Sequence, residues 1–105
     1  MAIIEGPGGP VELDERGYLK NAADWTRELA PLLASREGLR QLTPDHWLVV
    51  DVMRAHHAER GAMPMIRELC RATGFSLQRI YELFPKGPGQ DACRVAGLPK
   101  PDSCV

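Results

Sequence analysis

The chain has 105 residues, of which 44% are hydrophobic and 26% charged, with a formal net charge of −1. This length predicts a single domain with a modest core and excludes a large enclosed active site. No apolar run approaches the length of a membrane span, and the N-terminus lacks the features of a signal peptide, so we expect a cytoplasmic protein without membrane insertion. The near-neutral charge gives no strong attraction to nucleic acid.

Residues 1–19 predict a β-hairpin region. Ala2-Ile3-Ile4 and Val11-Glu12-Leu13 are short runs with strand propensity, and the segment from Gly6 to Pro10 contains only glycine and proline. Such a segment is typical of a turn. A second turn, over residues 14–17, is expected to lead into Tyr18-Leu19.

Residues 21–96 predict a helical core. The first helix is expected to be capped by Asn21 or Asp24 and to end near Gly38, with Pro31 causing a kink or an early stop. Its apolar face is expected to contain Trp25, Leu29, Leu32 and Leu33.

The second helix is predicted to be the central one. Thr43 provides a hydroxyl cap, Pro44 occupies the first helical position, and Gly61 ends the helix after about Arg60. Its buried face is expected to consist of Leu48, Val49, Val52, Met53 and His56, widened by Trp47 and Val50.

Two shorter helices are predicted next, in an arrangement like a helix-turn-helix. Pro64 opens the third helix, Gly74 ends it, and Ser76 caps the fourth. The inward side chains are expected to be Ile66, Leu69, Cys70 and Thr73, followed by Leu77, Ile80, Tyr81 and Phe84. Residues 85–88 break the chain, and residues 90–96 predict two more helical turns. The predicted fold is therefore mainly α, a small orthogonal helical bundle with an N-terminal β-hairpin.

Residues 97–105, here called the C-terminal arm, are expected to be mobile, because Pro99 and Pro101 prevent a helix and little apolar mass remains. The penultimate residue is Cys104, and Cys93 precedes the arm. Ten residues separate the two thiols, and closing such a loop costs about 3 kcal/mol of chain entropy. A persulfide on one sulfur could be released by attack of the other.

Other residues near the arm have simpler expected roles. Arg94 and Lys100 could stabilise a thiolate or a polysulfide anion. Cys70 lies on an apolar helix face and is expected to be a core residue.

The residues raise two alternatives, DNA binding and a metal or cofactor site. Gln78 and Arg79 in the predicted fourth helix could read DNA, although Glu82 and the net charge oppose this. The histidines and cysteines lack metal-ligand spacing, and no phosphate-binding loop follows the glycines near the N-terminus, so no metal and no cofactor are expected.

Several strings carry a family resemblance over nearly the whole chain: Gly17-Tyr18-Leu19, Asp24-Trp25, Leu42-Thr43-Pro44-Asp45-His46-Trp47, Leu83-Phe84-Pro85-Lys86-Gly87-Pro88, and Ala92-Cys93-Arg94-Val95-Ala96-Gly97-Leu98-Pro99-Lys100-Pro101 with Cys104-Val105. They resemble the DsrC/TusE family of sulfur-carrier proteins, one branch of which is the gamma subunit of dissimilatory sulfite reductase.

The resemblance implies that Cys104 accepts and donates sulfur and that Cys93 is the resolving thiol of a disulfide or trisulfide. A cysteine at position 93 is typical of the DsrC branch, whereas the TusE branch lacks it and serves tRNA thiolation. The implied partners are donor sulfurtransferases, dissimilatory sulfite reductase and a disulfide reductase complex. The chain would act as a protein co-substrate rather than as a self-sufficient enzyme.

One departure from the family pattern concerns residues 74–81. Many members have a longer insertion before the string that begins at Tyr81, whereas Gly74 is followed here directly by the fourth predicted helix. The shorter segment is expected to alter a docking surface for sulfite reductase.

Overall fold

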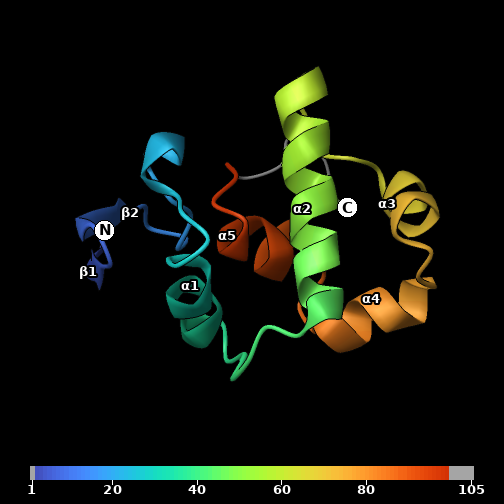
Figure 1. Ribbon diagram of the computed structural model, residues 1–105, viewed down its shortest axis with the longest axis horizontal. Coiled ribbons are helices and arrows are strands. Elements are labelled where there is room, and N and C mark those ends of the chain that lie inside the picture. Colours follow the sequence, from blue (N-terminus) through green and yellow to red (C-terminus); the bar gives the residue numbers. More distant parts are fainter. Residues whose placement is uncertain (1, 100–105) are drawn as a thin grey trace.

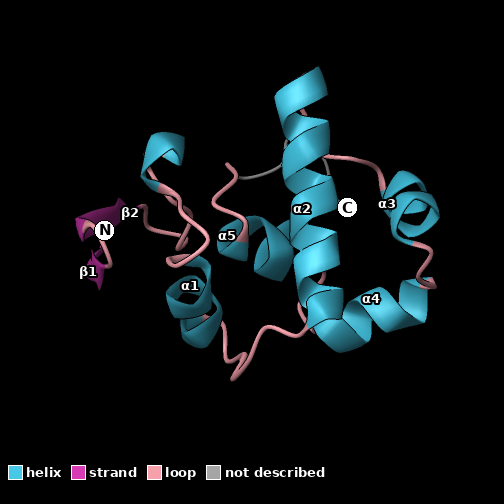
Figure 2. Ribbon diagram, viewed as in Figure 1, coloured by secondary structure: helices cyan, strands magenta, loops and turns pink. Residues whose placement is uncertain are grey.

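The computed structural model describes residues 2–99 of the chain and consists of helices around a short central helix, with a hairpin at one end (Figure 1). About half of the chain is helical, which confirms the predicted fold class (Figure 2). The elements in chain order are β1 (Ala2–Gly6), β2 (Gly9–Leu13), the 3-10 turn η1 (Ala22–Asp24), α1 (Ala30–Arg36), α2 (Pro44–Arg60), α3 (Ile66–Thr73), α4 (Leu77–Leu83), the π-helical turn η2 (Pro88–Ala92) and α5 (Cys93–Val95).

The predicted hairpin is confirmed, and its strands are longer than expected. Strands β1 and β2 pair antiparallel from Ala2 with Leu13 to Gly6 with Gly9, which leaves a two-residue turn. Gly9 has φ +125°, a conformation that favours glycine. Leu13 is fully buried and packs with side chains of α1, so the hairpin is attached to the helical core.

The first predicted helix differs from the observed one. Asn21 caps only the single turn η1, through a 3.1 Å hydrogen bond from the N–H of Ala23, and α1 begins at Ala30. Pro31 therefore lies in the first turn of α1, where its missing N–H costs nothing, instead of interrupting a helix. Leu32 points away from the core and is 42% exposed.

The predicted bounds of α2 are confirmed at both ends. The Thr43 side chain accepts a hydrogen bond from the N–H of His46, and Gly61 ends the helix with φ 72°. The predicted face is partly wrong, because Leu48 is 40% exposed. The fully enclosed face instead follows the helical spacing of residues 46, 49, 50 and 53.

Helices α3 and α4 form the predicted helix–turn–helix pair, with α4 running across the end of α2 (Figure 1). Gly74 ends α3, and the Ser76 hydroxyl caps α4 by accepting a 3.1 Å hydrogen bond from the N–H of Arg79. Leu77 and Tyr81 are exposed rather than buried, and Leu83 takes their place in the core. The described helices are too short or too polar to span a lipid bilayer.

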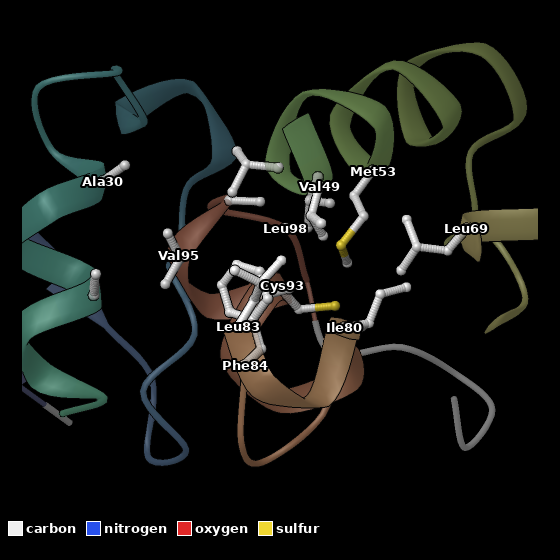
Figure 3. Close-up of a cluster of buried hydrophobic side chains, with 14 of the residues drawn as sticks. Ala30, Val49, Met53, Leu69, Ile80, Leu83, Phe84, Cys93, Val95 and Leu98 are labelled. Carbon is white, nitrogen blue, oxygen red and sulfur yellow. The ribbon is translucent and has the colours of Figure 1, made fainter. Parts of the chain in front are cut away.

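The core is centred on α5, which packs against both α1 and α2 (Figure 3). Leu98 is only 4% exposed and belongs to the same cluster as Val49 and Phe84. The C-terminal arm is expected to leave the domain at Gly97, but the structure keeps Gly97 and Leu98 in the core, because the Leu98 side chain has an apolar site to fill. Residues 100–105 lie outside the described part of the chain.

Candidate functional site

Cys93 is the first residue of α5 and lies in the centre of the core. Its side chain is fully buried, and in Figure 3 its sulfur points toward Met53 of α2 and Ile80 of α4. Burial raises the pKa of the Cys93 thiol to about 12, although the positive charge of Arg94 acts in the opposite direction. At neutral pH this thiol is therefore protonated and weakly nucleophilic.

Arg94 is already engaged by its neighbours in the fold. Its Nη1 donates a 2.7 Å hydrogen bond to Oε1 of Glu37, the residue that ends α1. Its guanidinium also lies 4.9 Å from the centre of the Tyr18 ring. The expected role of Arg94 beside a sulfur anion would therefore require it to leave or share Glu37.

Asp91 is a buried acidic residue next to this ion pair, and the sequence did not single it out. Its Oδ2 accepts a 2.8 Å hydrogen bond from the N–H of Lys86. Its Oδ1 is buried and meets no N–H or hydroxyl donor among residues 2–99. Burial raises the pKa of Asp91, the Lys86 N–H opposes this shift, and the adjacent Glu37 carboxyl raises the pKa further. A proton on Asp91 that is donated to Glu37 satisfies both carboxyl groups.

Each carbonyl at the C-terminal end of α5, from residue 93 to residue 96, accepts a hydrogen bond. The N–H of Leu98 bonds to the carbonyl of Cys93 at 3.0 Å, and the N–H of Gly97 bonds to the carbonyl of Arg94 at 3.2 Å. This pair of bonds is a Schellman motif with Gly97, at φ +69°, as its left-handed residue. The motif joins the first residues of the arm to the helix that carries Cys93.

Two side chains from other parts of the chain bind the remaining carbonyls. Nε1 of Trp25 donates to the carbonyl of Val95 at 2.9 Å, and Nη1 of Arg54 donates to the carbonyl of Ala96 at 2.6 Å. The Arg54 guanidinium also stacks over the Trp25 ring at 3.8 Å. A Cβ at position 97 would overlap this ring, so the backbone of Gly97 lies directly against Trp25.

The structure describes only some of the other residues that the sequence singled out. Cys104 and Lys100 lie outside residues 2–99. Cys70 is partly buried and packs against the core. Among the described residues, no group of three or more His, Cys, Asp and Glu is arranged to hold a metal ion. In the helix–turn–helix pair, Arg79 is bound by Asp45 at 2.8 Å and by Glu82 at 3.2 Å.

Comparison with known proteins finds relatives along the whole chain. The family described as DsrC like protein matches residues 6–105. The gamma subunit of dissimilatory-type sulfite reductase from Nitratidesulfovibrio vulgaris (strain Hildenborough) is 42% identical over 105 residues, which cover all of both chains. Sulfurtransferase TusE of Yersinia pestis is 42% identical over 110 residues, which cover 98% of this chain and all of TusE.

Solved structures also share the fold. A chain in the crystal structure of dissimilatory sulfite reductase I superposes with a TM-score of 0.90 at 42% identity, with 99% of this chain and 100% of that chain covered. The oxidised gamma subunit (DsrC) from Archaeoglobus fulgidus superposes with a TM-score of 0.88 at 38% identity and the same coverage.

One of these comparisons bears on the expectation about the segment 74–81. The N. vulgaris gamma subunit aligns over 105 residues with the full length of this 105-residue chain, so it has no insertion relative to it. The short segment therefore does not set this chain apart from a sulfite reductase relative. The match to residues 6–105 and the identity over the full length show that the chain belongs to the DsrC-like protein family.

Proposed function

We propose that this protein is a cytoplasmic sulfur carrier that accepts sulfur on Cys104 and discharges it with the help of Cys93. Relatives named as a sulfite reductase gamma subunit and as sulfurtransferases support the carrier role. The observation that carries the assignment of roles is the burial of Cys93, whose thiol pKa is about 12. A buried, protonated thiol is a poor first acceptor, which leaves the penultimate cysteine to take up sulfur.

The loading step transfers one sulfur atom between proteins. The Cys104 thiolate attacks the outer sulfur of a persulfide on a donor sulfurtransferase, the donor's S–S bond breaks, and the donor cysteine leaves as a thiolate. Cys104 then carries the persulfide. No oxidant is consumed, because one S–S bond forms as another breaks.

The discharge step uses the second thiol. The Cys93 thiolate attacks the inner sulfur of the Cys104 persulfide, an S–S bond forms between the two cysteines, and hydrosulfide leaves. A disulfide reductase would return both thiols. A trisulfide instead requires a two-electron acceptor, for which a low-molecular-weight disulfide suffices: it yields two thiols as the persulfide and the Cys93 thiol join.

The proposed partners follow from these steps. They are a donor sulfurtransferase, an enzyme of the sulfite reductase type that delivers or takes the sulfur, and a disulfide reductase complex. A relay for tRNA 2-thiolation of the TusE type would use the loading step alone, and the presence of Cys93 favours the pair chemistry over it. Regulation by DNA binding is less well supported, because Arg79 is held in two ion pairs.

The proposal is tested by loading the protein with inorganic polysulfide and measuring the intact mass, followed by peptide mapping. We expect wild type and Cys93→Ala to gain sulfur on Cys104, and Cys104→Ala to gain none. Cys70→Ala serves as the matched control and should behave as wild type. Loading of Cys104→Ala at the wild-type rate, with the sulfur on Cys93, would overturn the assigned roles.

A further inference from the structure

The helix that carries Cys93 is too short to be stable without contacts to the rest of the chain. Helix α5 (Cys93–Val95) directly continues the π-helical turn η2 (Pro88–Ala92), and an isolated helical segment of this combined length is not stable in water. Its place in the core must therefore come from contacts with the rest of the chain. Two of those contacts, from Trp25 and Arg54, bind its last carbonyls from outside the helix.

We propose that Trp25 and Arg54 are positioning residues for sulfur transfer, which keep Cys93 closed to Cys104 until their bonds to α5 open. We call Trp25, Arg54 and Gly97 the arm anchor. The proposal rests on the proposed function and adds a control step to it. The anchor acts through Cys93 and does not itself touch the transferred sulfur.

The coupling between the anchor and Cys93 is a continuous set of bonds. The carbonyl of Cys93 is bound by the N–H of Leu98, and the Leu98 side chain is buried in the same cluster as the Cys93 thiol. Between these two residues lie the carbonyls that Trp25 and Arg54 bind. Residues 93–98 therefore leave the core together, and the anchor bonds must break for them to do so.

The anchor also fixes the origin of the arm. Gly97 lies against the Trp25 ring, so the chain leaves the domain from a defined point. The six residues from Pro99 to Cys104 can span roughly 20 Å when extended. Cys104 can therefore reach a partner while Cys93 stays buried behind the anchor.

A closed anchor would prevent the two thiols from reacting with each other too early. An exposed Cys93 would attack the Cys104 persulfide soon after loading and release hydrosulfide before a partner receives the sulfur. A closed anchor separates loading from discharge, and a partner that displaces Gly97 from the Trp25 ring would open the anchor. Discharge would then occur in the complex rather than in the free carrier.

The chain offers a matched control for the experiment, because it contains a second Arg–Trp stack. Arg27 lies 4.3 Å from the Trp47 ring and is mainly exposed. We would measure the alkylation rate of Cys93 by iodoacetamide, mapped by peptide, in Trp25→Phe and Arg54→Gln and in the controls Trp47→Phe and Arg27→Gln. Loss of one anchor hydrogen bond should speed the labelling about tenfold, and the controls should stay within about twofold.

Two further measurements separate positioning from plain stabilisation. Urea unfolding gives the loss of global stability for each variant, and hydrogen exchange of the Leu98 amide reports opening at the anchor. We expect Cys93 labelling and Leu98 exchange to rise together and by more than the global loss accounts for. If labelling rises only in proportion to the global loss, or not at all, the anchor does not control Cys93 and the proposal fails.

The proposed function is tested by a different result in the same samples. In polysulfide-loaded protein, the lifetime of the Cys104 persulfide should shorten in Trp25→Phe and Arg54→Gln by the factor found for Cys93 labelling. An unchanged lifetime despite faster labelling would overturn the proposal. If wild type takes up no sulfur at Cys104, the carrier function fails, while labelling of Cys93 still decides whether the anchor closes over it.

Discussion

Substituting Gly97 by alanine tests how tightly the end of α5 is packed. Gly97 has φ +69°, and an alanine in this left-handed conformation costs about 1 kcal/mol. The added Cβ would also overlap the Trp25 ring. The indole must then move, and its 2.9 Å hydrogen bond to the carbonyl of Val95 is lost at a further cost of about 1 kcal/mol, with some loss of packing. We therefore expect Gly97→Ala to lower the free energy of unfolding by roughly 2–4 kcal/mol.

Gly74→Ala is the matched control for this prediction. Gly74 also follows a helix in the left-handed conformation, with φ +78°, but nothing lies within 4 Å of the position of an added Cβ. The control should therefore lose only the conformational term of about 1 kcal/mol. Urea unfolding followed by Trp fluorescence measures both losses. Equal losses at the two positions would show that the contact between Gly97 and Trp25 contributes nothing.

The remaining predictions concern pH. The raised pKa of Asp91 stabilises the fold at low pH, and this stability is lost as the pH rises through the folded pKa. Asp91→Asn keeps a donor toward Glu37. Above about pH 4 its free energy of unfolding should rise relative to that of wild type, by at most about 1.4 kcal/mol per pH unit. Parallel pH profiles for the two proteins would rule out a proton shared between Asp91 and Glu37. His46 must donate from Nε2 to the carbonyl of Leu83, so Nδ1 accepts from the N–H of Thr43. Since burial lowers the pKa of His46, stability should fall as the pH drops below about 6.5, and His46→Gln should weaken this dependence.

The parts of the fold that were predictable are those with local causes. A hydroxyl cap followed by proline starts α2, and glycines end α2 and α3, because each residue acts on its own turn of backbone. Pro31 has the same local effect, but it is compatible with either a break or a first turn. Packing favours the first turn of α1 for Pro31, because Leu29 and Leu33 are buried against the hairpin.

The candidate site depends on contacts that no local pattern contains. Glu37 and Asp91 interact in the folded chain but lie far apart in the sequence, with most of the helical core between them. The same is true of Trp25 and Val95. The spacing around Cys93 indicated a thiol within reach of the arm, but its depth is set by α1, α2 and α4 closing around α5. The sequence therefore predicts which residues carry the chemistry, whereas the burial of Cys93 and the bonding of α5 required the folded chain.

Burial makes the Cys93 thiol less reactive than an ordinary exposed thiol, and the size of this effect can be estimated. An ordinary exposed cysteine with a pKa of about 8.5 is roughly 3% ionised at pH 7. Cys93, with a pKa of about 12, is ionised to about one part in 10⁵, roughly 3,000-fold less. A thiolate of higher pKa is intrinsically the better nucleophile, and this offsets about 40-fold of the difference. The net disadvantage of Cys93 is about a hundredfold, to which its complete lack of exposed surface adds a steric barrier. On the proposed function, ionisation therefore slows discharge without preventing it, and keeping sulfur on Cys104 requires that α5 stay closed.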